Sequence, residues 1–191
     1  MKRSQKVAVV GAGLAGSEAA WQLAERGHAV RLFEMRPVRM TQVHKTGECA
    51  ELVCSNSFKS RSLENAHGLL KAEMALYNSM ILQTGERFSV PAGQAMAIDR
   101  EPFAESVTAQ LKEHSKISIY NDEVTDVAEL IDSHSHVIFA TGPLTSDALT
   151  ISLQDILETQ YLSFYDAIAP VVTAESINMD IAFRASRYGK G

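Results

Sequence analysis

The chain has 191 residues, of which 46% are hydrophobic and 21% are charged, and its formal net charge is −5. These values are typical of a soluble globular protein with one core and room for a small appendage. No apolar run reaches the roughly 20 residues of a membrane-spanning helix, and the short basic start does not lead into a signal peptide, so we expect a cytoplasmic protein without a membrane partner.

The negative charge argues against the chain as a whole being a nucleic-acid platform. Residues 35–61 nevertheless contain five basic and two acidic residues, a local charge of +3. This pattern is typical of a loop beside a cofactor phosphate or an RNA backbone, but charge alone favours an ordinary solvated loop. Cys49 and Cys54 are too few for a disulfide framework, and no nearby cluster completes a metal site, so we expect no metal.

A glycine-rich loop follows the first predicted strand, residues 7–10. Gly11, Gly13 and Gly16 stand in G-x-G-x-x-G spacing. Gly11 permits the tight turn out of the strand, Gly13 lets a pyrophosphate approach the backbone, and Gly16 lets the next helix pack closely on the sheet. The helix is predicted over residues 14–26, with its first amides directed at the phosphates.

The unit closes with a second strand and a carboxylate. Gly27 is a plausible helix stop, residues 29–33 are predicted to form the strand, and Glu34 follows at the spacing of a ribose-binding acid. This order predicts a dinucleotide-binding βαβ unit, although the motif does not separate FAD from NAD. The predicted cofactor contacts here are Gly11, Ala12, Gly13, Leu14, Ala15, Gly16 and Glu34.

Two further sets of residues are candidates for cofactor contacts. Arg36 is interpreted as a partner of a cofactor phosphate or, alternatively, as a surface residue. Thr141 and Gly142 end the predicted buried strand 136–141, and doubly wound sheets bind ligands at that edge. The long irregular segment after Glu34 is typical of a functional loop, and we expect its part from Cys49 to Cys54 to fold onto the cofactor.

The remaining elements complete an alternating α/β pattern. A helix over residues 65–83, ended by Gly85, is predicted to bury the stripe Leu70, Met74, Tyr77 and Ile81. Asp99 is a candidate N-cap for the next helix, which ends near His114. The histidines show no triad or metal pattern and are interpreted as solvated or packed. The other predicted elements are strands 87–90, 94–98, 117–120 and 124–127 and a helix over 147–158 with Leu149, Leu153 and Ile156 inward.

Several stretches closely resemble the folate- and FAD-dependent tRNA uracil-C5-methyltransferases (TrmFO). The stretches are VVGAGLAGSEAAWQLAERG, LFEMRP, HKTGECAELVCSNSFKS, NAHGLLKAEM, VPAGQAMAIDR, FATGPLTSDAL and FYDAIAPVVTAESINMDIAFRASRYGKG. The resemblance covers essentially the whole chain in order. AELVCSNS and ATGPLTSDAL are far more specific than the glycine motif.

The resemblance implies a Rossmann-like α/β fold, namely an FAD-binding domain of the glutathione-reductase type over residues 1–160, with the start of a second, inserted domain at 161–191. It implies a flavoenzyme that transfers a one-carbon unit from 5,10-methylenetetrahydrofolate to C5 of a T-loop uracil in tRNA, with FAD and NADH or NADPH as reductants. Family members continue beyond this chain and carry there a second cysteine, usually taken as the uracil nucleophile. The chain therefore resembles the amino-terminal portion of such an enzyme, and we expect it to be inactive alone.

By the same resemblance, Cys54 matches the family's cysteine near the flavin and is the predicted catalytic residue. The alternative is a packed structural cysteine, and Cys49 is assigned no role. Three other functions stay open. The chain could belong to a paralogue that methylates rRNA, it could be an inactive FAD-binding fragment, or, less in keeping with the spacing of its cysteines, it could be a flavin disulfide reductase.

Overall fold

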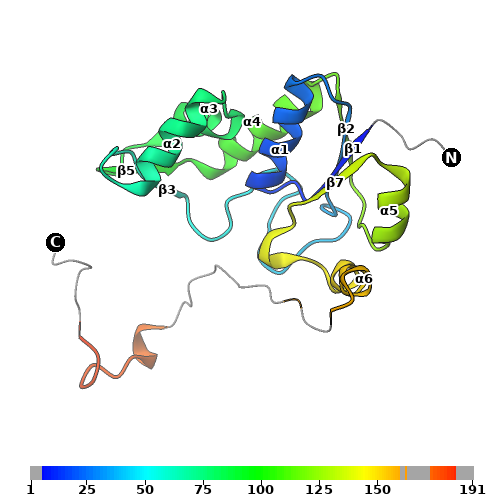
Figure 1. Cartoon of the computed structure of the whole chain (residues 1–191). Coiled ribbons are helices and arrows are strands. Elements are labelled where there is room, and N and C mark those ends of the chain that lie inside the picture. Colours follow the sequence, from blue (N-terminus) through cyan, green and yellow to red (C-terminus); the bar gives the residue numbers. More distant parts are fainter. Residues whose placement is uncertain (1–5, 160–161, 163–172, 184–191) are drawn as a thin grey trace.

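The computed structural model describes residues 6–159, 162 and 173–183. At its centre is a four-stranded parallel sheet in the order β6-β2-β1-β7, with helices on both faces (Figure 1). The strands are β1 (Val7–Val10), β2 (Val30–Phe33), β6 (Ile117–Tyr120) and β7 (His136–Phe139). The helices around it are α1 (Leu14–Glu25), α3 (Met80–Arg87), α4 (Arg100–Glu113), α5 (Val127–Ser133) and α6 (Asp147–Leu157).

Strand β1 lies in the middle of the sheet and is buried along its whole length. Val7 is in register with Val30 of β2 on one side and with His136 of β7 on the other. A parallel strand covered on both faces is expected to be continuously apolar, as VAVV is. The predicted βαβ unit and the Rossmann-like α/β fold are therefore confirmed.

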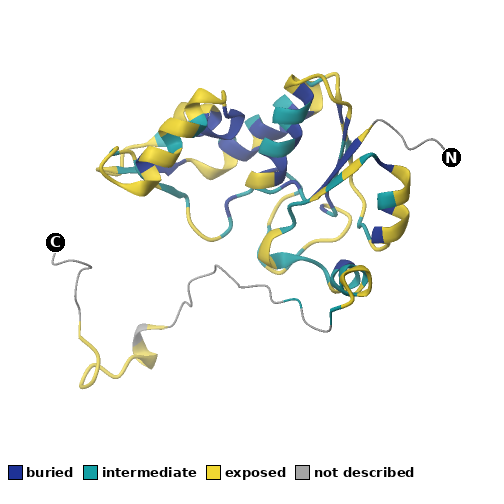
Figure 2. Cartoon of the chain, viewed as in Figure 1, coloured by how far each residue is buried: buried dark blue, intermediate teal, exposed yellow. Residues whose placement is uncertain are grey.

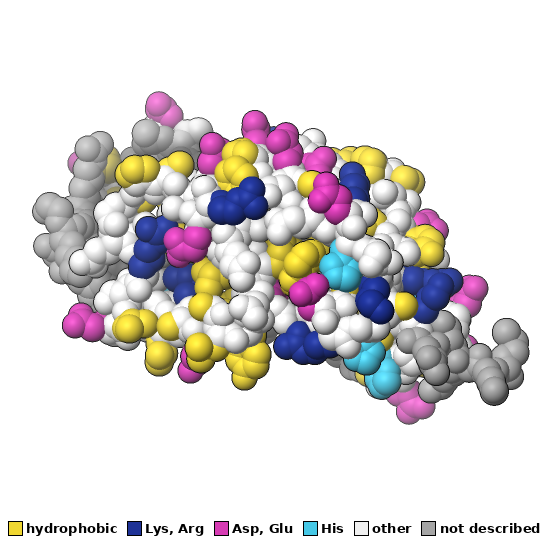
Figure 3. Space-filling model, turned by 90° about the horizontal axis from the view of Figure 1, so that it is seen from above, with side chains coloured by type: hydrophobic (Ala, Val, Ile, Leu, Met, Phe, Trp, Pro, Cys, Tyr) yellow, Lys and Arg dark blue, Asp and Glu magenta, His cyan; other side chains and the backbone are white. Residues whose placement is uncertain are grey.

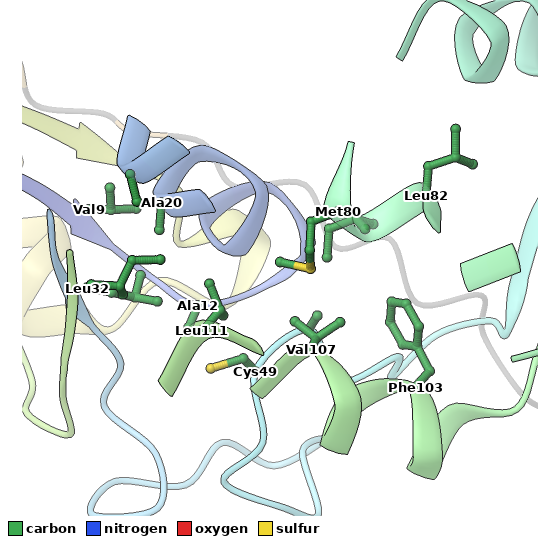
Figure 4. Packing of buried hydrophobic residues seen from close by; sticks show 14 of the residues in the cluster. Val9, Ala12, Ala20, Leu32, Cys49, Met80, Leu82, Phe103, Val107 and Leu111 are labelled. Atoms are coloured by element: carbon green, nitrogen blue, oxygen red, sulfur yellow. The ribbon is translucent and has the colours of Figure 1, made fainter. Parts of the chain in front are cut away.

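Each face of the sheet has its own apolar core. On the face of α1 and α4, Leu32 of β2 belongs to the same buried cluster as Phe103, Val107 and Leu111 of α4, which confirms that predicted stripe (Figure 4). On the other face, small and branched residues of β1 meet α5 and α6. Figure 2 shows the buried residues concentrated along β1 and the inward sides of the helices. The carboxyl ends of β1, β2 and β7 are thus held rigidly at one edge.

A second, antiparallel sheet extends the layer of α3 and α4. It consists of β3 (Ser57–Ser60), β5 (Ala95–Ile98) and β4 (Ser89–Val90), in that order. The pairing of β4 with β5 confirms the two short strands predicted there, whereas β3 was not predicted. Gly85 lies inside α3 rather than ending a helix. A side chain at Gly85 would approach Phe58 to 2.9 Å and Met96 to 3.0 Å, so the glycine permits close packing.

The single helix predicted over residues 65–83 is wrong, because the chain forms α2 (Ala66–Leu76) and then α3. Asn78 adopts a left-handed conformation with φ +54°, and the Ser79 hydroxyl accepts a hydrogen bond from the Leu82 amide to start α3. Because of this break, the residues of the predicted stripe do not share one buried face: Leu70 and Tyr77 are 54% and 68% exposed.

The strand predicted over residues 124–127 is also wrong. Residues 124–126 form no strand, and Val127 begins α5, where the Asp126 carboxylate accepts a hydrogen bond from the Glu129 amide. Strand β7 is confirmed but lies at the edge of the described sheet, with Ile138 36% exposed rather than buried. Helix α6 is confirmed with Leu149 buried, whereas Ile156 is exposed. 

Asp99 occupies the N-cap position of α4 as predicted, but its side chain makes no capping hydrogen bond. Most of the predicted second domain lies outside the described residues, which there comprise Leu162 and 173–183 with a short 3-10 helix, η2 (Ala174–Ser176). The domain boundary near 160 therefore stays a prediction. Within the described part of the chain, no helix has the length and apolar character needed to cross a membrane.

Candidate functional site: a cavity at the carboxyl edge of the sheet

A cavity of about 360 Å³ lies where β1, β2 and β7 end. Its wall combines the β1–α1 loop, the long segment after β2, the segment after β6 and the start of the segment after β7. It brings together most of the predicted cofactor residues: Gly11, Gly13, Leu14, Ala15, Glu34, Arg36, Thr141 and Gly142. The predicted catalytic residue, Cys54, lines the same cavity. Binding at this edge is the rule in doubly wound sheets.

The three loop glycines differ in what a side chain at each position would meet. A side chain at Gly16 would come within 1.8 Å of the Gly11 carbonyl oxygen, and one at Gly11 would come within 2.7 Å of the Ala140 carbonyl oxygen. A side chain at Gly13 would meet no protein atom within 4 Å, although Gly13 lines the cavity. The protein itself therefore does not demand glycine at position 13. A ligand lying against the backbone would require it, and this role of Gly13 stays a prediction of the sequence.

The start of α1 offers donors to such a ligand. Gly13 is the N-cap residue, no side chain caps the helix, and Leu14 and Ala15 border the cavity. The first amides of a helix lack intrahelical acceptors and carry partial positive charge, so a phosphate group fits there. The cavity and this uncapped helix start suit a dinucleotide.

The backbone of Ala12 links three segments beneath the cavity, which together form its floor. Its amide donates to Glu34 Oε2 over 2.9 Å, and its carbonyl accepts from the Ala50 amide over 2.8 Å and from Ser17 Oγ over 3.1 Å. Ala12 is completely buried and, like Gly16, is not part of the cavity wall. Direct cofactor contact by these two residues stays a prediction.

Glu34, Arg36 and Glu51 form a buried charge network beside this floor. Arg36 Nε lies 2.8 Å from Glu34 Oε1, and Arg36 Nη1 lies 3.2 Å from Glu51 Oε2. Only 2% of Arg36 and 6% of Glu34 are exposed, so the interpretation of Arg36 as a surface residue is wrong. The sequence did not single out Glu51, because its role depends on a partner 15 positions away.

Both carboxylates are held in their charged form. Burial by itself raises the pKa of Glu34, but hydrogen bonding and charge attraction from Arg36, with the amides of Ala12 and Arg36, outweigh it and leave the pKa below its ordinary value. For Glu51 the opposing contributions are burial, which raises the pKa, and hydrogen bonds from Lys45 and Thr46, which lower it further than burial raises it. The network therefore carries a net charge of −1, with its cation already paired.

The two cysteines occupy unlike places. Cys49 is buried beside Leu111 and Val107, its amide donates to Thr108 Oγ1, and burial raises the pKa of its thiol to about 11 (Figure 4). Cys54 is exposed and lines the cavity. The thiolate is the reactive form of cysteine, so the geometry favours Cys54 over Cys49 as a reactive group. The segment between them folds against the cavity, as the sequence predicts.

Besides Glu51, sequence reasoning missed further residues at the cavity and its rim. His44, which had been interpreted as solvated or packed, lines the cavity together with Thr41, and its Nδ1 lies 2.6 Å from Thr41 Oγ1. At the rim, Arg39 pairs with Glu123, joining the segment after β2 to the segment after β6. The only sequence signal was the basic character of residues 35–61, which does not reveal these contacts.

The end of β7 supplies the remaining wall. Gly142 has φ +63° and begins a short 3-10 helix, η1 (Gly142–Leu144), while Thr141 Oγ1 lies 2.6 Å from Thr145 Oγ1. Thr141 and Gly142 therefore sit at the ligand edge as predicted, although their contact with a cofactor stays a prediction. Among the described residues, no group of three or more His, Cys, Asp or Glu side chains could hold a metal ion.

The charge on the face shown in Figure 3 does not mark a nucleic-acid interface. Basic and acidic side chains are interspersed there rather than gathered into one large basic area. The local excess of positive charge in residues 35–61 is partly internal, since Arg36 is buried. This view consequently provides no nucleic-acid interface to set beside the cavity.

Comparison with known proteins shows which family the sequence of the chain matches. The profile of the family described as "Glucose inhibited division protein A" matches residues 6–191. The methylenetetrahydrofolate–tRNA-(uracil-5-)-methyltransferase TrmFO of Natranaerobius thermophilus is 52% identical over 186 residues, which cover 97% of this chain and 42% of that protein. The TrmFO of Moorella thermoacetica is 53% identical over 188 residues, with 98% and 42% covered.

A solved structure supports the fold independently. GidA of Aquifex aeolicus superposes with a TM-score of 0.56 at 16% identity, covering 72% of this chain and 25% of that one. The similarity to TrmFO proteins that the sequence suggested is confirmed along almost the whole chain. The chain spans about two fifths of the length of the curated relatives it matches.

Proposed function

Because the chain belongs to the glucose inhibited division protein A family, we propose that it is the amino-terminal, FAD-binding part of a tRNA uracil-C5-methyltransferase. The observation that carries this proposal is the identity of about half of all residues with TrmFO proteins, together with a cavity lined by the predicted dinucleotide and cysteine residues. In this proposal the donor is 5,10-methylenetetrahydrofolate, the acceptor is a T-loop uracil of tRNA, and the reductant is NADH or NADPH.

The described residues fit FAD at this cavity. The amides at the start of α1, beside Gly13, are placed to bind the pyrophosphate, and Glu34, at the end of β2, stands where an acid binds the adenosine ribose. Gly142 and Thr141 close the opposite wall. When bound, FAD supplies the two-electron reduction that turns a methylene unit into a methyl group.

Cys54 is the residue of this chain proposed to act in the chemistry. It is exposed at the cavity wall, so its thiolate can reach a ligand there, whereas the Cys49 thiol is buried and protonated. Activation of the uracil requires a nucleophile that adds to C6. The resemblance assigns that role to a further cysteine, distinct from Cys49 and Cys54, in the part of the longer family members that lies beyond the region matched by this chain.

A chimera tests the proposal. Residues 1–191 replace the matching amino-terminal segment of the Bacillus subtilis TrmFO, which is 51% identical over 187 residues. We expect the purified chimera to show the visible spectrum of bound flavin and to form 5-methyluridine in unmodified tRNA when supplied with methylenetetrahydrofolate and NADH or NADPH. Cys54→Ala should remove methylation, and Cys49→Ala should retain it.

The outcomes separate the alternatives. Methylation of rRNA in place of tRNA favours the rRNA paralogue. Flavin binding without any methylation, in a chimera whose parent enzyme is active in the same assay, contradicts the methyltransferase proposal and leaves a flavin-binding module. A folded chimera that binds no flavin contradicts the cofactor assignment itself. The isolated chain, assayed in parallel, tests our expectation that it is inactive alone.

A further inference from the structure

We infer that His44 is a ligand-binding residue of the cavity, which donates an Nε2–H hydrogen bond to an oxygen atom on the adenosine diphosphate half of the bound dinucleotide. The inference rests on the proposed function, because it takes the cavity to be a dinucleotide site. It assigns a role to a side chain that the sequence motifs do not single out.

The hydrogen bonds around Thr41 determine the tautomer of His44. Thr41 Oγ1 lies 3.2 Å from the His44 amide and 3.4 Å from the Val43 amide, and both amides can only donate. A hydroxyl oxygen has two lone pairs and one hydrogen. With both lone pairs engaged, the hydroxyl donates its own hydrogen to His44 Nδ1, 2.6 Å away. The ring nitrogen Nδ1 is therefore an acceptor, and the hydrogen of the neutral ring sits on Nε2.

This arrangement leaves Nε2–H as the donor that the ring can offer to a ligand. His44 lines the cavity and is half-buried. No described residue accepts a hydrogen bond from Nε2 in the recorded contacts of His44, all of which run to Thr41. A donor fixed in direction by a local turn loses little freedom on binding, so it suits recognition of a ligand oxygen.

The neighbours of His44 place it at the adenosine end. The charged groups that act on the ring are Arg36, Glu51 and Glu34, and Glu34 ends β2 at the ribose-binding position. The two carboxylates can only accept hydrogen bonds, and Arg36 already uses Nε and Nη1 within the protein. His44 therefore adds, at this end of the cavity, an Nε2–H donor for an oxygen atom of a ribose or a phosphate.

The electrostatic setting keeps the ring neutral. Burial lowers the pKa of His44 and the nearby positive charge of Arg36 lowers it further, while Glu51 and Glu34 only partly oppose these effects. At neutral pH the ring therefore carries one hydrogen, in agreement with the tautomer required by Thr41. A protonated ring would place a second positive charge beside Arg36 and lose the hydrogen bond from the Thr41 hydroxyl.

The test is ligand binding by the full 191-residue chain, measured at pH 7.5 by isothermal titration with FAD and, separately, with ADP. His44→Phe keeps a planar ring but removes the donor, and His44→Gln places an amide N–H near the position of Nε2. We expect His44→Phe to weaken binding of both ligands by about tenfold, the loss of one hydrogen bond to a strongly accepting oxygen. We expect His44→Gln to stay within about threefold of the unaltered chain. Thr41→Val should weaken binding by an intermediate factor, because it frees the tautomer.

His28→Phe is the matched control, because His28 is exposed and lies outside the cavity wall. Melting temperatures of all variants report whether each one folds. Unchanged affinity of a folded His44→Phe variant overturns the inference, and so does a loss confined to FAD, since the contact would then lie on the flavin half. An unaltered chain that binds neither ligand overturns the proposed cofactor site and this inference with it. Binding by the unaltered chain with no effect at His44 overturns the inference alone.

Discussion

The two segments that form most of the cavity obtain their shapes in different ways. The β1–α1 loop follows a short sequence motif: the Gly13 carbonyl accepts a hydrogen bond from the Ser17 amide four residues later, and the Gly11 amide donates to Phe33 at the end of the next strand of the βαβ unit. The segment after β2 is determined by distant partners, since Arg36 pairs with Glu51 and the Cys49 amide donates to Thr108, 59 positions away. The shape of the β1–α1 loop can therefore be predicted from its motif, whereas the shape of the segment after β2 depends on tertiary contacts.

The largest expected loss of stability comes from removing Arg36, the cation of the charge network in the segment after β2. Arg36→Met leaves the buried carboxylate of Glu34 and the half-buried carboxylate of Glu51 without their positive partner. We expect the free energy of unfolding to fall by about 3–5 kcal/mol, as for other broken buried ion pairs, in urea denaturation at pH 7.5. Lys59→Met, at an exposed side chain, is the control and should change it by less than about 0.5 kcal/mol. Equal, small effects of the two changes would show that the network is not a source of stability.

Substitutions in the glycine loop should affect stability and ligand binding separately. Gly16→Ala forces a methyl group within 1.8 Å of the Gly11 carbonyl oxygen, and we expect a loss of about 3 kcal/mol in the same assay. Gly13→Ala meets no protein atom, so stability should change by less than about 1 kcal/mol while FAD affinity falls at least tenfold. Unaltered FAD affinity in Gly13→Ala would sink the assignment of this loop to the pyrophosphate.

The two cysteines of the segment after β2 should differ in the reactivity of their thiols. A pKa of about 11 keeps the thiolate fraction of Cys49 about 100-fold below that of a thiol with an ordinary pKa, and burial blocks access as well. We expect iodoacetamide at pH 8 to label Cys54 at least 100-fold faster than Cys49, as followed by peptide mass spectrometry. In urea both should react at similar rates. Comparable labelling in the folded chain would contradict the assigned burial.

The smallest effect is expected at the rim. Arg39 and Glu123 pair across the two segments, but the Arg39 side chain is 48% exposed, so solvent weakens the attraction. We expect Arg39→Ala to leave the urea midpoint of unfolding almost unchanged, and 1 M salt to reduce even that small difference. A shift of the urea midpoint as large as that of Arg36→Met would mean that the Arg39–Glu123 pair, and not only the buried network, holds the segment after β2 in place.

The same division explains what the sequence could predict. The βαβ unit, the close packing at Gly11 and Gly16 and the α4 stripe follow from local pattern, and they are confirmed. The break between α2 and α3 was missed because Glu18, on α1, accepts hydrogen bonds from Ser79 Oγ and the Ile81 amide, contacts that span more than 60 positions. Likewise α5 replaced a predicted strand where the Val127 amide donates to Ser152 Oγ.

The candidate site shows the same limit. Spacing identified Glu34, Gly11 and Gly13, and the resemblance to a family identified Cys54, and all four line the cavity. Glu51 and His44 have no motif of their own, because each acquires its role from Arg36 or Thr41 after the segment has folded. The burial of Arg36 was equally hidden, since an arginine at a strand end is ordinarily solvated.

The hydrogen bonds of Ala12 have a thermodynamic consequence for any ligand. Its amide and carbonyl join the first loop to the end of β2 and to the segment after it, so the floor of the cavity is assembled when the chain folds. A ligand then enters a site that is already ordered there, and little conformational entropy is lost when it binds. Occupancy in turn favours the folded state, with each tenfold rise in ligand concentration above the dissociation constant adding about 1.4 kcal/mol to the free energy of unfolding.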